Sequence, residues 1–168
     1  MSNFLAAQLY REEIKYELTK RWYDEKYKYY FGGCAEEFNI PNDNYWRRDF
    51  AHLDIEGNLD GYFSYKYDSA AKSLSNFGLI GFAENNTKLV FDALSHIKAL
   101  FKTGEVRRVC WWAFEDNPAN KLYERIIRKY NGKINGKETD CVFVEGRYWS
   151  SISYEIICDG GLYNEKIN

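Results

Sequence analysis

The sequence predicts an α+β fold in which strands and amphipathic helices follow one another along a single domain. Two patterns indicate it. Apolar residues recur every three or four positions over 87–102, and side chains alternate over 59–67, with Tyr62 on one face and Phe63, Tyr65 and Tyr67 on the other. A third, over 106–114, is a run of β-forming apolar residues typical of a strand buried on both faces. The chain has 168 residues, which suits one domain spanning 1–168, and no stretch has the composition of a linker.

In the first half, a strand, a helix and three further strands are expected. Ile14, Leu18 and Trp22 recur at four-residue steps, so residues 12–31 predict a helix packed by one face. The segment 34–50 is rich in turn-forming residues and is expected to be a loop with a helical turn at 45–50. Strands are expected at 4–10, 51–55, 59–67 and 74–82, with a hairpin turn at 56–58 and another turn at 68–72.

The second half is expected to alternate helices and strands and to end on a hairpin. The helix over 87–102 has Asn86 or Thr87 as a candidate cap and Gly104 after its end. Another helix is expected after Pro118, with apolar residues at regular spacing to Tyr130. The remaining strands are expected at 106–114, 139–144 and 147–157.

The charge and cysteine content narrow the function classes. The formal net charge is −2, from 23 basic and 25 acidic residues, so no overall field attracts nucleic acid or an anionic membrane. No apolar run approaches the roughly 20 residues that span a bilayer. The two histidines lie far apart and none of the four cysteines forms a C-x-x-C pair, so no metal site is expected. Reduced thiols and the absence of a signal peptide favour a cytoplasmic protein.

The element order and four short motifs resemble the GNAT superfamily of acyl-CoA-dependent N-acetyltransferases. The motifs are Asn117-Pro118-Ala119-x-x-Leu122-Tyr123-Glu124, Lys129-Tyr130-x-Gly132, Gly146-Arg147-Tyr148 and Tyr154-Glu155-Ile156. The resemblance covers roughly residues 4–156. It implies a mixed, mostly antiparallel, twisted central sheet flanked by helices. It also implies acetyl transfer from acetyl-CoA to a primary amine by direct attack in a ternary complex, without metal.

The chain departs from the family's pattern at the loop that binds the cofactor diphosphate. The family carries Gln/Arg-x-x-Gly-x-Gly/Ala there, whereas this chain reads Glu84-Asn85-Asn86-Thr87-Lys88-Leu89. Any helix start presents unpaired N–H groups, but without glycine the backbone approaches a diphosphate less closely. The family's hairpin aspartate is also replaced, near Ser150. A second reading is therefore a degenerate GNAT-fold interaction module without catalytic activity. A third is a nucleic-acid accessory protein that uses Arg107, Arg108 and Arg125.

The resemblance places the cofactor on two segments. The start of the helix at 87 would hold the diphosphate, and the strand before it, with Gly78 and Gly81, would approach the acetyl and pantetheine groups. Asn117 would bind the pantetheine arm. The alternatives are plain helix caps at both places and glycines that only accommodate neighbouring aromatic rings. The candidate cofactor-binding residues are Phe82, Asn85, Asn86, Thr87, Lys88, Leu89, Asn117 and Asn120.

The resemblance also assigns two catalytic candidates. Tyr123 would donate a proton to the departing CoA thiolate, since a tyrosine pKa near about 10 lies close to a thiol pKa near about 8.5. Its alternative is a core tyrosine beside Leu122 and Ile126. Glu84 would accept the proton of the attacking amine, and its alternative is an acid that stabilises the helix dipole. The acceptor is a small-molecule or protein amine, and the sequence gives no oligomeric state.

Overall fold

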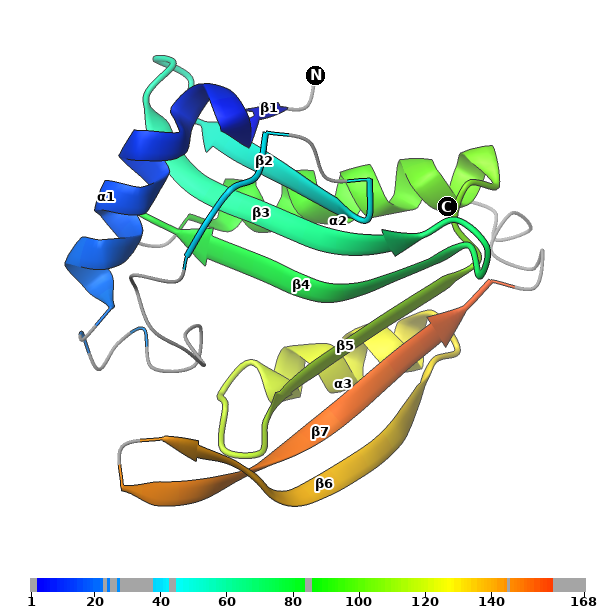
Figure 1. Cartoon of the computed structure of the whole chain (residues 1–168). Coiled ribbons are helices and arrows are strands. Elements are labelled where there is room, and N and C mark those ends of the chain that lie inside the picture. Colours follow the sequence, from blue (N-terminus) through cyan, green and yellow to red (C-terminus); the bar gives the residue numbers. More distant parts are fainter. Residues whose placement is uncertain are drawn as a thin grey trace. The chain divides into compact units, whose positions relative to one another are not determined.

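The computed structural model describes residues 3–22, 24, 27, 38–42, 45–83, 86–144 and 146–158 (Figure 1). The chain divides into two compact units. Unit 1 comprises Met1–Tyr67 and Phe77–Ala99, and unit 2 comprises Asp68–Asn76 and Leu100–Asn168. The single-domain organisation expected from the sequence stays a prediction.

The described residues form a mixed, mostly antiparallel sheet with helices, which confirms the predicted fold class. The strands are β1 (Phe4–Ala6), β2 (Arg47–Leu53), β3 (Leu59–Asp68), β4 (Ser73–Gly81), β5 (Arg108–Phe114), β6 (Lys133–Val144) and β7 (Arg147–Ile157). The helices are the 3-10 helix η1 (Ala7–Tyr10), α1 (Arg11–Arg21), α2 (Thr87–Thr103) and α3 (Asn120–Lys129). Hydrogen bonding gives the strand order β1-β2-β3-β4-β5-β7-β6, and the β4–β5 pair is parallel.

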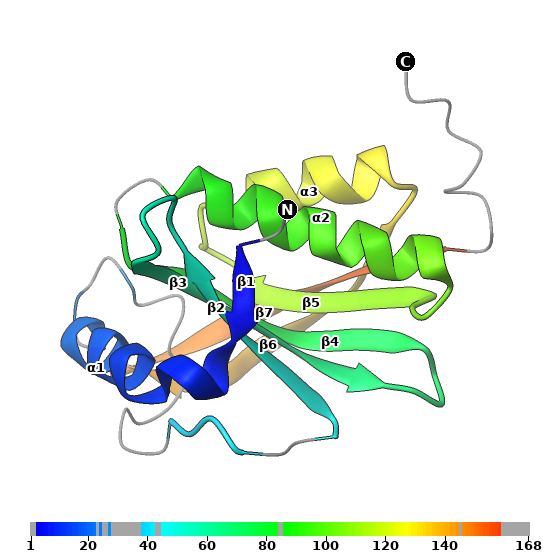
Figure 2. The same ribbon diagram turned by 90° about the horizontal axis from the view of Figure 1, so that it is seen from above.

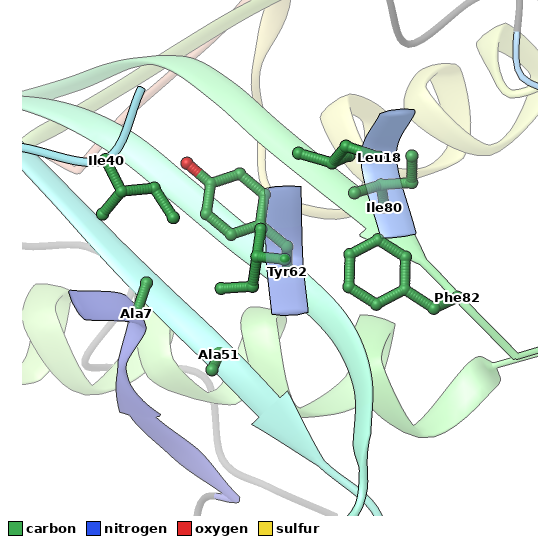
Figure 3. Close-up of a cluster of buried hydrophobic side chains, with 8 residues drawn as sticks. Ala7, Leu18, Ile40, Ala51, Tyr62, Ile80 and Phe82 are labelled. Carbon is green, nitrogen blue, oxygen red and sulfur yellow. The ribbon is translucent and has the colours of Figure 1, made fainter. Parts of the chain in front are cut away.

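In unit 1, successive side chains along each strand point to opposite faces of the sheet, and a different helix covers each face. Figure 2 shows α1 and α2 on opposite sides of these strands. Ala51 and Tyr62 face the side of α1, where they form an apolar cluster with Ile14 and Leu18 (Figure 3). The burial of this cluster removes apolar surface from water and fixes α1 on the sheet.

The opposite face of unit 1 is aromatic and is covered by α2. The rings of Phe50 and Phe63 lie 5.9 Å apart, and those of Phe63 and Tyr65 lie 5.5 Å apart. His96 of α2 lies 5.0 Å from Phe50 and 6.0 Å from Phe63 between ring centroids. The predicted division of β3, with Tyr62 on one side and Phe63 and Tyr65 on the other, is confirmed.

The hairpin between β2 and β3 follows the predicted turn. Asp54 Oδ1 accepts the N–H groups of Glu56 at 2.9 Å and Asn58 at 2.8 Å, and Gly57 has a φ of 88°. A positive φ is readily adopted by glycine because it has no Cβ. The turn sets the antiparallel register in which Ala51 lies opposite Tyr62.

In unit 2, β7 is paired on one side with β5 and on the other with β6, both antiparallel. Figure 1 shows α3 alongside β5 and β7. The chain re-enters the sheet after α3 at Gly132, where a Cβ would lie 2.5 Å from the backbone oxygen of Glu155. Gly132, singled out in the sequence, is thus required by a close backbone approach.

Two predictions for the N-terminal region were wrong in extent. Only Phe4–Ala6 of the expected strand at 4–10 is a strand, and the 3-10 helix η1 follows it. The helix expected over 12–31 ends at Arg21, where the N–H of Trp22 turns back to the carbonyl of Thr19 at 3.3 Å. An apolar side chain every fourth residue does not show where a helix stops.

Two strands begin earlier than the sequence indicated. The helical turn expected at 45–50 was wrong, because β2 begins at Arg47, which pairs with Lys66 of β3. Likewise β6 begins at Lys133, opposite Glu155 of β7, rather than at Thr139. In both cases the partner strand supplies backbone hydrogen bonds to residues whose own β-propensity is low.

Candidate functional site

The start of α2 is the segment predicted to bind a diphosphate, and Asn86 shapes it. The Oδ1 atom of Asn86 accepts the N–H of Leu89 at 3.0 Å, and its Nδ2 donates to the backbone oxygen of Asp60 at 3.0 Å. Asn86 is therefore the N-cap of α2, which was one of the two alternatives open from the sequence. Glu84 and Asn85 lie outside the described residues.

The first turn of α2 divides into exposed and buried residues. Thr87 and Lys88 are exposed, whereas Leu89 is 1% exposed and belongs to the core. The first N–H groups of a helix have no acceptor within the helix, and the positive end of the helix dipole lies there. Since Asn86 takes the N–H of Leu89, the groups of this turn suited to an anion are the N–H groups of Thr87 and Lys88.

Glycines let α2 start close against the strands of unit 1. A Cβ at Gly61 would lie 2.8 Å from Leu89 Cδ2, and one at Gly81 would lie 3.1 Å from Asn86 Cβ. A Cβ at Gly78 would lie 2.7 Å from Ser64 Oγ. The space beside Gly78 and Gly81 is thus taken mainly by Ser64 and Asn86 rather than by the aromatic rings named in the alternative, although Tyr62 Cε1 would lie 3.7 Å from a Cβ at Gly78.

Phe82 follows β4 and has both backbone groups engaged. Its N–H donates to the carbonyl of Asp60 at 2.8 Å, and its carbonyl accepts Nη2 of Arg21 at 2.7 Å. The guanidinium of Arg21 also lies 5.3 Å from the centroid of the Phe82 ring. Phe82 is buried, so these contacts fix the chain at the end of β4.

Near the start of α2, a histidine lies between two carboxylates, and no motif in the sequence indicated this arrangement. His52 is fully buried; its Nδ1 contacts the carboxylate of Asp60, and its Nε2 lies 3.0 Å from Asp92 Oδ2. Asp92 also accepts Nζ of Lys88 at 2.8 Å. Burial opposes ionisation of Asp92, but the hydrogen bonds from Lys88 and His52 hold its pKa below its ordinary value.

In unit 2, the loop from β5 to α3 is held by two asparagines. Asn117 Oδ1 accepts the N–H of Ala119 at 2.9 Å, which forms a local turn before the helix. Asn120, 8% exposed, donates through Nδ2 to the carbonyls of Phe114 and Glu115, both at 2.8 Å. Its Oδ1 accepts the hydroxyl of Tyr154 at 3.1 Å. The Asn120 amide thus connects the loop, α3 and β7.

Tyr123 lies one turn into α3, in a cluster of rings. Its ring centroid is 5.9 Å from that of Trp111 and 5.6 Å from that of Tyr154, both edge-on, while Trp111 and Tyr154 stack at 5.4 Å. Burial and the nearby Glu124 carboxylate raise the pKa of Tyr154. Tyr123 is half-buried and Tyr154 is buried, so Tyr123 is the more accessible of the two hydroxyl-bearing rings.

Other parts of the described chain give no further chemistry. No group of three or more His, Cys, Asp or Glu side chains among the described residues could hold a metal ion. Cys110, Cys141 and Cys158 are unpaired thiols, and burial raises the pKa of Cys110, which is partly exposed. Arg108 pairs with Glu155, with its Nε 2.6 Å from Oε2. None of the helices in the described ranges is both long and apolar enough to cross a membrane.

The predicted site residues therefore fall into two sets, one in each unit. In unit 1, Phe82 and Asn86 are both bonded to Asp60, and Lys88 and Leu89 follow on α2. In unit 2, Asn117 and Asn120 hold the loop that leads to Tyr123. The residues that sequence reasoning missed are His52, Asp60 and Asp92, along with Trp111.

Several solved acetyltransferase structures resemble this chain, although no protein-family model and no curated protein sequence matches it. RimL, a ribosomal L7/L12 alpha-N-protein acetyltransferase in complex with coenzyme A, matches with a TM-score of 0.57 and 14% identity, over 68% of this chain and 63% of that one. An acetyltransferase from Salmonella typhimurium that modifies the N-terminal serine of L7/L12 matches with a TM-score of 0.55 and 15% identity, over 68% of this chain and 66% of that one.

The spermidine/spermine N-acetyltransferase SpeG from Vibrio cholerae matches over more of both chains. Its TM-score is 0.59 and its identity 17%, over 92% of this chain and 79% of that one. The chain spans less than two thirds of the two L7/L12 acetyltransferases, at 63% and 66%. The chain has the fold of the GNAT acetyltransferases, as the motifs in its sequence predicted.

Proposed function

We propose that this chain transfers an acetyl group from acetyl-CoA to a primary amine, by direct attack in a ternary complex. The observation that carries the proposal is the shared fold: the matching structures named above are acetyltransferases, and one of them is a complex with coenzyme A. The acceptor is a small-molecule or protein amine.

The first step is binding of the diphosphate of acetyl-CoA at the start of α2. The N–H groups of Thr87 and Lys88 and the helix dipole attract an anion there, and the Lys88 ammonium adds a positive charge. Asn85 and Thr87 occupy the places of the family's two small residues. The diphosphate would therefore bind to two N–H groups and one lysine, which are fewer groups than the family's glycine loop offers.

In the transfer step, the neutral amine nitrogen attacks the thioester carbonyl carbon. A C–N bond forms, and the carbonyl electron pair moves to oxygen. The oxygen electron pair then re-forms the C=O bond as the C–S bond breaks with its electron pair going to sulfur, and the amine loses one proton. We assign Tyr123 as the donor of a proton to that sulfur and Glu84 as the acceptor of the amine proton. Both assignments rest on the family resemblance.

A second candidate function, a non-catalytic interaction module, is favoured by one observation. Asn86 already satisfies the N–H of Leu89, so the start of α2 has a side-chain cap without any ligand. Such a module would keep the fold and would not bind acetyl-CoA.

Thermal unfolding with and without acetyl-CoA separates the two functions. A ligand at 100 times its dissociation constant adds about 2.7 kcal/mol to the free energy of unfolding. For a chain of this size that raises Tm by roughly 5 to 10 °C. An unchanged Tm at millimolar acetyl-CoA contradicts the transferase and supports the interaction module.

A further inference from the structure

We propose that His52 is a positioning residue for the diphosphate-binding turn, which it holds through Asp60 and Asp92. The inference rests on the proposed function, because it takes the start of α2 as the place where acetyl-CoA binds. It assigns a role to a buried side chain that the transfer mechanism does not use.

His52 joins β3 to α2 through its two ring nitrogens. Nδ1 contacts the carboxylate of Asp60, the second residue of β3, and Nε2 lies 3.0 Å from Oδ2 of Asp92 on α2. A carboxylate offers hydrogen-bond acceptors, and a histidine ring nitrogen can donate to one. The buried ring of His52 therefore connects carboxylates on two different elements. Removal of the imidazole leaves both carboxylates without this partner.

Asp60 carries the first connection to the cofactor turn. Its backbone oxygen accepts both Nδ2 of Asn86 at 3.0 Å and the N–H of Phe82 at 2.8 Å. Phe82 directly follows the last residue of β4, and Asn86 caps α2. Because His52 contacts the carboxylate of Asp60, it also holds the Asp60 backbone oxygen to which Phe82 and Asn86 bond.

Asp92 carries the second connection. Its Oδ2 atom accepts Nε2 of His52 and also Nζ of Lys88, at 2.8 Å. Lys88 is half-exposed in the first turn of α2, so its ammonium is directed by a carboxylate whose own position depends on His52. The network therefore ends on three residues of the predicted cofactor set: Phe82, Asn86 and Lys88.

A second histidine of unit 1 serves as a matched control. His96 lies one turn beyond Asp92 on α2, among the aromatic rings, and its Nε2 lies 3.0 Å from the hydroxyl of Tyr65. The substitution His96→Gln removes an imidazole from the same helix–sheet interface. It tests whether any loss at that interface weakens cofactor binding, or only a loss at His52.

The experiment is calorimetric titration of coenzyme A into the whole chain as wild type, His52→Gln and His96→Gln. We expect His52→Gln to weaken coenzyme A binding about tenfold, a factor that equals about 1.4 kcal/mol, and His96→Gln to leave it within twofold. In steady state, His52→Gln raises KM for acetyl-CoA by a similar factor and leaves kcat and the acceptor KM unchanged. A merely structural role does not produce that split.

Asp60→Asn is the second variant and keeps the proposal testable if His52→Gln fails to fold. It preserves the backbone oxygen that Asn86 uses and removes the charge that pairs with His52, so we expect the same direction with a smaller loss. Binding within twofold of wild type in the folded variants overturns the inference alone. Failure of wild type itself to bind millimolar coenzyme A overturns the proposed function, and the inference with it.

Discussion

Asparagine serves in opposite ways at two strand-to-helix junctions of the described chain. One junction leads from β4 to α2 in unit 1, and the other from β5 to α3 in unit 2. Asn86 lies before its helix, accepts the N–H of Leu89 and donates to Asp60. Asn120 is the first residue of its helix, is buried, and turns its amide back to the carbonyls of the preceding loop. One asparagine organises a helix end; the other closes a loop.

The side chains around the two junctions also differ. Behind Asn86, buried His52 lies between two partly buried carboxylates. Beside Asn120 lie the rings of Trp111, Tyr123 and Tyr154. Free helix N–H groups suit an anion, whereas a ring cluster holds a hydroxyl in one place. We therefore propose binding at the first junction and proton transfer at the second.

The largest expected effect is on the rate, from Tyr123→Phe. The change removes one hydroxyl and keeps the ring that packs on Trp111 and Tyr154. Loss of a general acid lowers kcat by roughly 100-fold or more. The dissociation constant of coenzyme A should stay at the wild-type value. Steady-state assays of CoA release check the rate, and equal turnover by the two proteins removes Tyr123 from the mechanism.

The next effect is on stability, from Asn120→Ala. The variant leaves the carbonyls of Phe114 and Glu115 and the hydroxyl of Tyr154 without their partner. Unsatisfied buried groups of this kind cost about 2 to 4 kcal/mol in the free energy of unfolding. Urea denaturation measures it. Asn117→Ala, which loses one bond to Ala119, is the matched control and costs about 1 kcal/mol.

Asn86→Asp is expected to affect both stability and coenzyme A binding. Aspartate caps a helix as well as asparagine does, but it cannot donate to the backbone oxygen of Asp60, so the free energy of unfolding should fall by about 1 to 2 kcal/mol. A negative charge at the diphosphate turn should weaken coenzyme A binding about tenfold, equal to about 1.4 kcal/mol. Urea denaturation and calorimetric titration on the same sample give both numbers. Unchanged affinity would move the diphosphate away from α2.

The smallest effect concerns acid stability. The folded-state pKa of Asp92 lies below its ordinary value of 3.8, because hydrogen bonds from Lys88 and His52 outweigh burial. The carboxylate is thus ionised and stabilising above that value, and its contribution is lost as the pH falls through the folded-state pKa. Between about pH 5 and pH 3, a range around the ordinary Asp pKa of about 3.9, wild type should lose more stability than Asp92→Asn. Urea midpoints measure this loss. Parallel losses in both proteins would contradict the pairing.

Local patterns predicted the elements whose own residues dictate them. The stripe from Val90 to Phe101 gave α2 within one residue of its end, and the cap at Asn86 was one of two candidates named. The alternation in β3 correctly placed Tyr62 and Phe63 on opposite faces. In these cases the periodicity of the sequence matches the geometry of the element.

The prediction failed where a strand depends on its partner rather than on its own residues. Residues 45–50 favour a helical turn by their sequence, whereas the strand from Arg47 is set by pairing with β3. The charges behind α2 were missed for the same reason: His52 lies 8 residues from Asp60 and 40 from Asp92 along the chain. No short motif relates residues so far apart, and only the fold brings them into contact.

The central claim is that the start of α2 binds the diphosphate of acetyl-CoA, and amide NMR tests it most directly. Backbone N–H resonances are followed while coenzyme A is added to the labelled wild-type chain. We predict that Thr87 and Lys88 show the largest shifts in unit 1 and that Leu89, whose N–H already donates to Asn86 Oδ1, shifts less. Saturable shifts that leave Thr87 and Lys88 unmoved would contradict it.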